Sequence, residues 1–156
     1  MDIMLLDVNN VKKTFGRGLN ATTALNGISF NVDRGEFVAI MGESGSGKST
    51  LLNLIATYDK ATEGTITIDA QNIRQLRNKE IAYFRRDHLG FVFQDFNILP
   101  TMTNKDNILM PLVLANRSHQ TMRHRLYRLS YQLHIEPLLN KYPFEISGGE
   151  QQRVAI

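Results

Sequence analysis

Short hydrophobic runs separated by glycine and polar residues set the pattern of this chain. Residues 37–41, Phe-Val-Ala-Ile-Met, form an apolar run between two glycines. The length and composition of this run favour a buried strand. Residues 48–56 carry four aliphatic side chains that suit a helix starting just after Gly47. The pattern therefore predicts a strand, a glycine-rich loop and a helix in succession.

Two further strands are predicted on either side of this unit. Residues 23–32 read as a strand, and residues 64–69 alternate as a half-exposed strand does. Residues 89–93 form another short apolar run, which we interpret as a core strand.

Beyond Pro100 the pattern becomes helical. One apolar stripe at helical spacing is formed by Met122, Leu126, Leu129 and Leu133. We therefore expect a mixed α/β part at residues 1–94 and a helical part at residues 95–156.

The composition indicates the class of protein but does not identify a reaction or a ligand. The chain has 156 residues, 42% of them hydrophobic and 21% charged, as in an ordinary soluble domain. The net charge of +3 permits an acidic partner but does not require one. Basic stretches at 74–86 and 117–128 are interpreted as solvated helix faces. They lack the interleaved aromatic residues of a single-strand nucleic-acid platform, so no nucleic-acid partner is expected. The absence of cysteine excludes disulfides and thiolate metal sites.

Nothing in the sequence predicts a membrane-spanning helix. The first ten residues have no basic segment before an apolar run and do not resemble a secretion signal. The longest apolar run, 108–115, is interrupted by Pro111 and is far shorter than the roughly 20 residues that cross a bilayer. Any membrane contact is expected to be peripheral.

The loop between the predicted strand and helix carries a phosphate-binding pattern. Residues 42–50 read GESGSGKST and satisfy G-x-x-x-x-G-K-[ST]. Backbone N–H groups of such a turn can point inward at an anion, and the following helix presents its positive end to the same anion. Lys48 can reach the outer phosphates, and the Ser49 hydroxyl can join a Mg²⁺ shell. The predicted ATP-binding residues here are Gly42, Glu43, Ser44, Gly45, Ser46, Gly47, Lys48, Ser49 and Thr50.

A second helix start lies near the end of the chain. Residues 146–153 read ISGGEQQR, in which Ser147 followed by Glu150 is a capping-box pattern. The pair Gly148 and Gly149 would let a ligand approach the backbone closely. The residues alone leave two interpretations, a simple capped helix and a helix N-terminus suited to an anion.

Together these motifs resemble the ATP-binding subunit of an ABC transporter. The segment ISGGEQQ is similar to the family's signature motif, whose common form is LSGGQ. Gln94 matches the family's Q-loop glutamine, and Phe15 matches the aromatic residue that stacks on adenine. The resemblance covers nearly the whole chain. The segments GEFVAIMGESGSGKSTLLNLIATYD and FVFQDFNILPTMT look most like the branch of lipoprotein-releasing, macrolide-export and antimicrobial-peptide-resistance ATPases.

The resemblance implies a fold and residue roles. The fold would be α/β, a P-loop NTPase (RecA-like) core with an antiparallel β-subdomain and an α-helical subdomain. Phe15 would stack on the base of ATP, residues 42–50 would hold the phosphates, and Ser49 and Gln94 would contact Mg²⁺. Gln94 would also contact the attacking water. The signature residues would contact ATP bound to a second nucleotide-binding subunit in a head-to-tail dimer; they are Ser147, Gly148, Gly149 and Glu150.

The resemblance also implies a membrane partner. The protein would lie in the cytoplasm, peripheral on the inner face of the cell membrane, and bind a transmembrane permease subunit. It would couple Mg-ATP binding and hydrolysis to export or extraction of a substrate. In the family, the surface after the Q-loop helps receive a cytoplasmic helix of the permease. Core packing is the alternative for the residues concerned, Phe96, Ile98, Leu99 and Pro100.

The sequence departs from the family pattern after the signature. There the family carries the Walker B aspartate and glutamate, the D-loop and the switch histidine. No apolar run ending in Asp-Glu occurs before Ile156, and all four histidines precede the signature, so we expect them to be surface or packing residues. We expect a fold truncated before the Walker B strand. This chain alone would bind nucleotide weakly without turnover, because hydrolysis needs an oriented water and a complete charge clamp.

Two alternatives to a transport ATPase stay open. A non-transport ABC ATPase of the cell-division type shares the same branch features. A non-catalytic binding remnant would fit a chain without the later motifs. A repair-type ATPase is excluded, because the intervals between Lys48, Gln94 and Ser147 leave no room for its long insertion.

Overall fold

The computed structural model describes residues 4–156 and divides into two compact units. The first unit ends at Gly90 and the second begins at Phe91. Each unit has its own hydrophobic core. In residues 4–156, no helix is long and apolar enough to cross a membrane.

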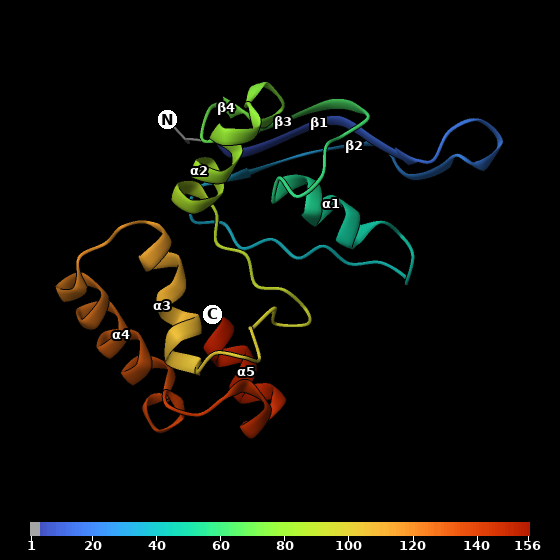
Figure 1. The fold of residues 1–156 in the computed structure, drawn as a ribbon. Helices are drawn as coiled ribbons and strands as arrows, with labels where there is room; N and C mark the ends of the chain where they lie inside the picture. Colours follow the sequence, from blue (N-terminus) through green and yellow to red (C-terminus); the bar gives the residue numbers. More distant parts are fainter. Residues whose placement is uncertain (1–3) are drawn as a thin grey trace. The chain divides into compact units, whose positions relative to one another are not determined.

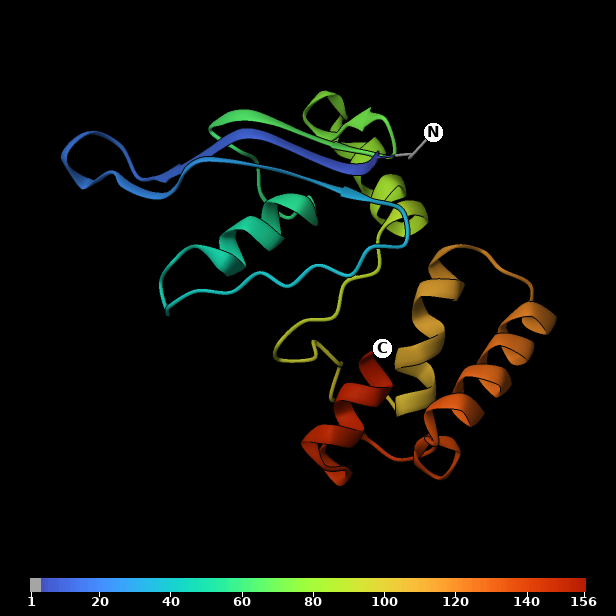
Figure 2. The same ribbon diagram turned by 180° about the vertical axis from the view of Figure 1, so that it is seen from behind.

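The first unit is an antiparallel sheet covered on one face by two helices (Figures 1 and 2). Within the described residues the sheet has four strands in the order β2-β1-β3-β4. The strands are β1 (Met4–Phe15), β2 (Thr22–Asp33), β3 (Glu63–Ile68) and β4 (Gln71–Asn72). The helices are α1 (Lys48–Ile55) and α2 (Asn78–His88), with short 3-10 turns η1 (Gly18–Asn20) and η2 (Ile73–Gln75). The predicted strands at 23–32 and 64–69 and the predicted helix after Gly47 are therefore confirmed.

Strand β1 does not follow strict alternation. Val8 and Val11 are both almost completely buried, although they stand three positions apart. The register with β2 shifts between them, as in a β-bulge. The Asn10 N–H inside this irregular stretch donates to Ser29 Oγ at 2.8 Å. The bulge explains why β1 has no clear period-two signal in the sequence.

The core of the first unit lies between the sheet and the two helices. Leu54 of α1 is 1% exposed, and Phe84 of α2 is 4% exposed. They share one cluster of buried residues with Val8, Val11, Leu25, Leu51, Ile66 and Ile68. Full burial of one such side chain contributes about 1.5–3 kcal/mol. This packing anchors α1 to the sheet and so fixes the loop that precedes it.

Two predicted strands are wrong. Residues 37–41 form no ladder, and Phe37 and Met41 are 97% and 87% exposed. At 89–93, Leu89 caps α2, and the following residues carry no regular structure. A buried strand of a parallel sheet needs hydrogen-bonded neighbours. Within residues 4–156 neither run has a partner strand, and so neither becomes a strand despite its composition.

The second unit is helical, as predicted. Its helices are α3 (Asn104–Leu114), α4 (His119–Leu133) and α5 (Gly148–Ala155), with 3-10 turns η3 (Glu136–Leu138) and η4 (Pro143–Glu145). Its core consists of Ile135, Leu138, Ile146 and Val154. On α4 the predicted stripe is only partly covered, since Leu133 packs on this core whereas Leu129 is 45% exposed.

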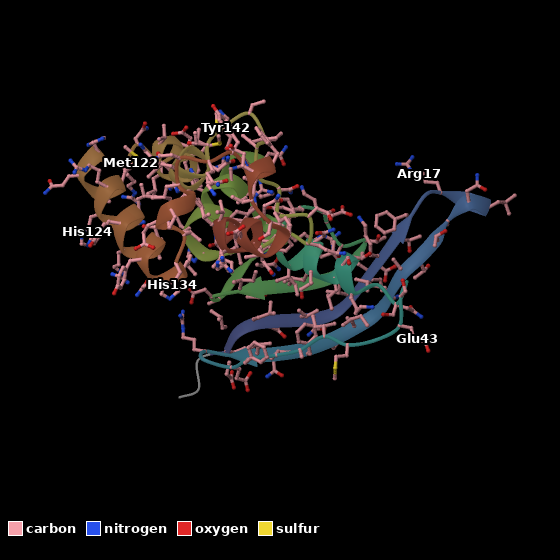
Figure 3. The ribbon with its side chains drawn as sticks, turned by 90° about the horizontal axis from the view of Figure 1, so that it is seen from below. Arg17, Glu43, Met122, His124, His134 and Tyr142 are labelled. Atoms are coloured by element: carbon pink, nitrogen blue, oxygen red, sulfur yellow. The ribbon has the colours of Figure 1, made fainter. Side chains whose placement is uncertain are left out.

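The basic stretches and the histidines lie on the surface, as expected. Most arginines of the two basic stretches are exposed. All four histidines are exposed, and Figure 3 labels His124 on α4 and His134 at its C-terminal end.

Candidate functional site

The predicted phosphate loop is seated against strand β2. Gly47 immediately precedes α1 and has a left-handed backbone, with φ 90° and ψ 5°. A Cβ at Gly47 would lie 2.6 Å from the Ala24 carbonyl oxygen and 2.8 Å from Leu25 Cδ2. Only glycine combines this conformation with so close an approach. The β2 backbone thus determines where the loop enters α1.

Lys48 folds back over this loop. Its Nζ donates to the carbonyl oxygens of Gly42 at 2.8 Å and Glu43 at 2.6 Å, and lies 3.4 Å from Ser46 Oγ. The ammonium is therefore held at the mouth of the turn by oxygen acceptors. Phosphate oxygens are acceptors of the same kind with a full negative charge, so they can replace these carbonyls.

The loop is accessible to a ligand. Residues 42–46 and Ser49 are exposed, and Figure 3 shows Glu43 projecting outward from the loop. The first-turn N–H groups of α1 have no intrahelical acceptor, and the helix N-terminus carries a partial positive charge. An anion bound here would meet both the N–H groups and Lys48.

The residues at this loop fit a magnesium ion carried by phosphates. Within residues 4–156, no three His, Asp or Glu side chains gather into a metal centre. Mg²⁺ is usually held by one or two protein oxygens together with substrate phosphates and water. Ser49, exposed in the first turn of α1, offers one such hydroxyl.

Phe15 lies at the same end of the first unit as the phosphate loop. It is the last residue of β1 and pairs with Thr22, two positions before the Ala24 that Gly47 approaches. Its side chain is 45% exposed. The predicted base platform is thus at the end of β1, and the predicted phosphate loop lies against the neighbouring strand β2.

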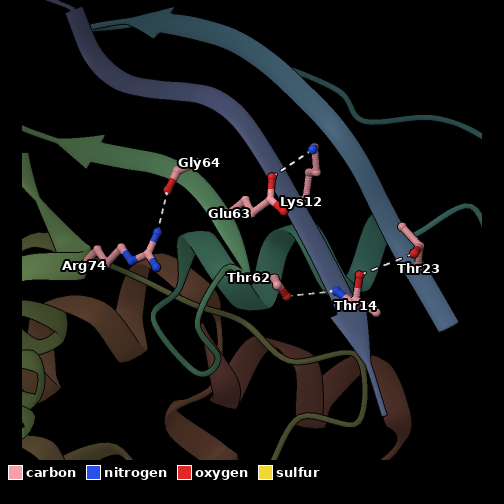
Figure 4. A network of polar contacts seen from close by, with 7 residues as sticks. All are labelled: Lys12, Thr14, Thr23, Thr62, Glu63, Gly64 and Arg74. Carbon is pink, nitrogen blue, oxygen red and sulfur yellow. Dashed lines mark hydrogen bonds and ion pairs between the residues drawn. The ribbon is translucent and has the colours of Figure 1, made fainter. Parts of the chain in front are cut away.

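Polar contacts hold the strand that carries Phe15 (Figure 4). The Thr14 N–H donates to Thr62 Oγ1 at 3.0 Å, and the Thr14 and Thr23 hydroxyls are 3.3 Å apart. Lys12 forms an ion pair with Glu63 at 2.8 Å. These bonds tie the end of β1 to β2 and to the start of β3.

The signature segment forms a capped helix in the second unit. Ser147 is the N-cap of α5, and Glu150 Oε2 accepts from both the Ser147 N–H and its hydroxyl at 2.8 Å. These two hydrogen bonds, the backbone one first, lower the pKa of Glu150 below its ordinary value. A Cβ at Gly148 or Gly149 would meet no atom within 4 Å. The predicted capping box is present, and its glycines leave an open approach to the helix start.

Gln94 is exposed on a turn at the start of the second unit. A few residues later, Ile98 packs on the core of this unit, and with Phe96 it lines a cavity of about 330 Å³ between α3, α4 and α5. Leu99 is 44% exposed. Of the residues suggested as a docking surface, Ile98 therefore packs inward, whereas Leu99 faces outward.

Asn107 of α3 holds the segment after Gln94, a role that sequence reasoning missed. Its Oδ1 accepts from the Leu99 N–H at 2.8 Å. Its Nδ2 donates to the Leu99 and Thr103 carbonyls, both at 3.0 Å, and lies 3.3 Å from the Met102 carbonyl. No spacing rule connects an asparagine in a helix with a backbone segment eight residues earlier, so only the structure could find it.

Lys13 was also missed. Its Nζ lies 4.9 Å from the centroid of the Phe15 ring and 2.7 Å from Asp59 Oδ1. The i, i+2 spacing of Lys13 and Phe15 on a strand could have indicated that both side chains share one face.

Comparison with known proteins relates the chain to ABC ATP-binding proteins. The ABC transporter family matches residues 25–156. The ABC transporter ATP-binding protein YxdL of Bacillus subtilis (strain 168) is 47% identical over 152 residues, covering 97% of this chain and 59% of the relative. The bacitracin export ATP-binding protein BceA of Halalkalibacterium halodurans is 43% identical, covering 97% and 60%. The macrolide export ATP-binding/permease protein MacB of Shigella flexneri is 40% identical, covering 97% and 24%.

Solved structures give the same relationship. MJ0796 of Methanocaldococcus jannaschii, a dimeric ABC transporter cassette, superimposes with a TM-score of 0.90 at 42% identity, covering 97% of this chain and 67% of that one. Its dimeric post-hydrolysis state, bound to ADP and Pi, gives a TM-score of 0.89 at 41% identity with the same coverage. The predicted α/β cassette fold is thereby confirmed.

The chain spans 59% and 60% of the lengths of YxdL and BceA. With the family match across residues 25–156 and these identities, the chain belongs to the ABC transporter family.

Proposed function

We propose that this chain supplies the nucleotide-binding part of an ABC transport ATPase, and that residues 42–50 bind the phosphates of ATP. The observation that carries this proposal is the Lys48 ammonium, held 2.6–2.8 Å from two loop carbonyls beside the N-terminus of α1. Binding exchanges these neutral acceptors for phosphate oxygens, which form stronger, charge-assisted bonds. Phe15, at the end of β1, supplies an apolar ring for the base.

Magnesium enters this proposal as a partner of the phosphates. Ser49 contributes its hydroxyl, and Gln94 is assigned the second protein contact through the family resemblance. When bound, the ion neutralises charge on the phosphate oxygens. The chain's own groups then bind and orient the nucleotide: the loop N–H groups, Lys48 and Phe15.

The signature segment is proposed to complete the site of a second nucleotide-binding subunit. Its open glycines and the capped start of α5 can approach a phosphate across an interface. The dimeric state of MJ0796 supports this arrangement. Residues 1–94 would then hold one nucleotide, and residues 95–156 would contact the nucleotide of the other subunit. Hydrolysis is proposed for the full-length protein within such a head-to-tail dimer.

A transmembrane permease is the proposed second partner. The names of BceA and MacB describe export, and MacB combines an ATP-binding part with a permease. We propose that the full-length protein couples ATP hydrolysis to export or extraction of a substrate, on the cytoplasmic face of the membrane. Leu99, with 44% of its side chain exposed, is an accessible apolar residue in the segment assigned to permease contact.

Nucleotide binding by the full-length protein tests the central proposal. Calorimetry with Mg-ATP and Mg-ADP should give saturable binding that Lys48→Ala weakens at least tenfold, since a charge-assisted bond of about 1.5–3 kcal/mol is lost. The matched control is Lys79→Ala, which removes an exposed lysine of α2 and should leave the affinity unchanged. Equal affinity in Lys48→Ala and wild type would refute the proposal. Co-purification with a permease separates the transport function from the cell-division alternative.

A further inference from the structure

The Phe15 ring is held on one side by a lysine of its own strand. Lys13 Nζ lies over the ring, 4.9 Å from its centroid. A cation over an aromatic face is attracted by the ring's quadrupole. This contact brings the two side chains together although the register between β1 and β2 shifts between Lys13 and Thr14.

Lys13 is itself fixed by the turn that follows α1. Its Nζ donates to Asp59 Oδ1 at 2.7 Å and to the Lys60 carbonyl at 2.8 Å. Its side chain is only 11% exposed. Burial opposes ionisation of Asp59, but hydrogen bonds from Lys13 and from the Lys60 N–H outweigh this effect and lower the pKa of Asp59. Asp59 is therefore ionised at neutral pH, and its hydrogen bond leaves Lys13 little freedom to move.

The neighbouring lysine provides a comparison within the same strand. Lys12 forms an ion pair with Glu63 at 2.8 Å, with side-chain exposure of 37% and 59% (Figure 4). Lys12 thus binds the first residue of β3, and Lys13 binds Asp59 in the turn before it, but of these two lysines Lys13 is the one whose Nζ lies over the Phe15 ring. Any effect specific to the ring should follow Lys13 and spare Lys12.

We propose that Lys13 is a positioning residue for the nucleotide base: anchored by Asp59 and the Lys60 carbonyl, it holds one face of Phe15 and leaves the other face for a purine. This proposal rests on the proposed function and deepens it. A ring held in place before binding loses less freedom when the base stacks, so the affinity for the base rises. The Asp59–Lys60 turn follows α1, whose other end begins at the phosphate loop, so one helix connects the base and phosphate subsites.

The test separates base binding from phosphate binding in the full-length protein. Calorimetry would measure the dissociation constants of the non-hydrolysable ATP analogue AMP-PNP and of inorganic tripolyphosphate, both with Mg²⁺. Lys13→Met should weaken AMP-PNP binding by roughly two- to tenfold, the range expected when one side chain must be ordered on binding rather than before it. Tripolyphosphate, which has no base, should bind as it does to wild type. Lys13→Arg keeps the cation and should restore AMP-PNP binding, and Lys12→Met should match wild type with both ligands.

Several outcomes overturn the proposal. Unchanged AMP-PNP binding in Lys13→Met does so, and so does an equal loss for both ligands, because that would show a general effect on the loop or the fold. If Lys13→Met fails to fold by circular dichroism, Asp59→Asn carries the test. It removes the carboxylate that anchors Lys13 and should weaken AMP-PNP binding selectively by about twofold to threefold, because Lys13 and the ring are then less ordered before binding. An unchanged ratio of the AMP-PNP and tripolyphosphate dissociation constants overturns the proposal. Wild-type protein that binds neither ligand refutes the proposed function itself, whereas equal binding of both ligands refutes only the base platform.

Discussion

The phosphate loop packs against β2 at Gly47. Replacing Gly47 with alanine tests whether this close packing requires glycine at that position. Gly47 has φ 90°, and a Cβ there would lie 2.6 Å from the Ala24 carbonyl oxygen. Gly45, in the same loop, has a similar φ of 85°, but a Cβ there would meet nothing within 4 Å. The two glycines therefore share the backbone requirement and differ only in the space beside them.

The magnitudes follow from these two differences. A side chain in the left-handed region costs about 1–2 kcal/mol, and this applies to both substitutions. Alanine also restricts the unfolded chain more than glycine does, which stabilises the folded state. This contribution is the same for both variants and cancels in the comparison. Only Gly47→Ala must also push the loop away from β2, which costs about 1–3 kcal/mol as overpacking does. Gly47→Ala should therefore destabilise the protein by about 1–3 kcal/mol more than Gly45→Ala.

Urea unfolding of the two variants measures this difference. The slopes of the transitions should agree, and the midpoint of Gly47→Ala should lie below that of Gly45→Ala. Calorimetry with Mg-ATP should also show the larger loss in Gly47→Ala, because displacement of the loop moves Lys48 and the N-terminus of α1 together. Equal midpoints would refute the reasoning, since the close approach to Ala24 would then cost nothing.

Three further predictions concern other parts of the chain. Asn107→Ala should destabilise the second unit by about 1–3 kcal/mol by leaving backbone groups unpaired, and hydrogen exchange should accelerate in the segment after Gln94. The pKa of Glu150 is lowered on folding, so its stabilisation of α5 is complete above its ordinary pKa and is lost as the pH falls through the folded value. An NMR titration of the α5 amides should show this acid transition in wild type and not in Glu150→Gln. Leu54→Ala, at a site 1% exposed, should cost about 2–5 kcal/mol in thermal or urea unfolding, whereas Leu52→Ala, at a site 43% exposed, should cost below about 1 kcal/mol.

The phosphate loop and α1 could be predicted because their signals are local. The glycines, Lys48 and the aliphatic stripe of α1 all lie within 15 residues of one another, and each favours the same local conformation. The capped start of α5 was predictable for the same reason, since Ser147 and Glu150 satisfy each other within one helical turn. These features need little information from distant parts of the chain.

Strand prediction failed where pairing was decisive. The run at 37–41 has the composition of a buried strand but no partner within residues 4–156, and Phe37 is 97% exposed. Strand β1 is the opposite case, because its bulge near Asn10 breaks the alternation while its pairing with β2 and β3 is extensive. Composition describes what a strand can bury, whereas pairing decides whether the strand forms.

The proposed base and phosphate subsites both lie beside the β1–β2 hairpin, and this has a mechanical consequence. Phe15 ends β1, and the loop rests on β2 through Gly47 and Ala24, so the register between β1 and β2 fixes the relation of the ring to the loop. A change in that register would displace the base and phosphate contacts together. Loss of Lys13 should disturb only the base contact, and loss of Lys48 only the phosphate contact. The antiparallel sheet carries few of the groups assigned to the nucleotide. Its register nevertheless determines whether Phe15 and the phosphate loop can contact the same nucleotide at once.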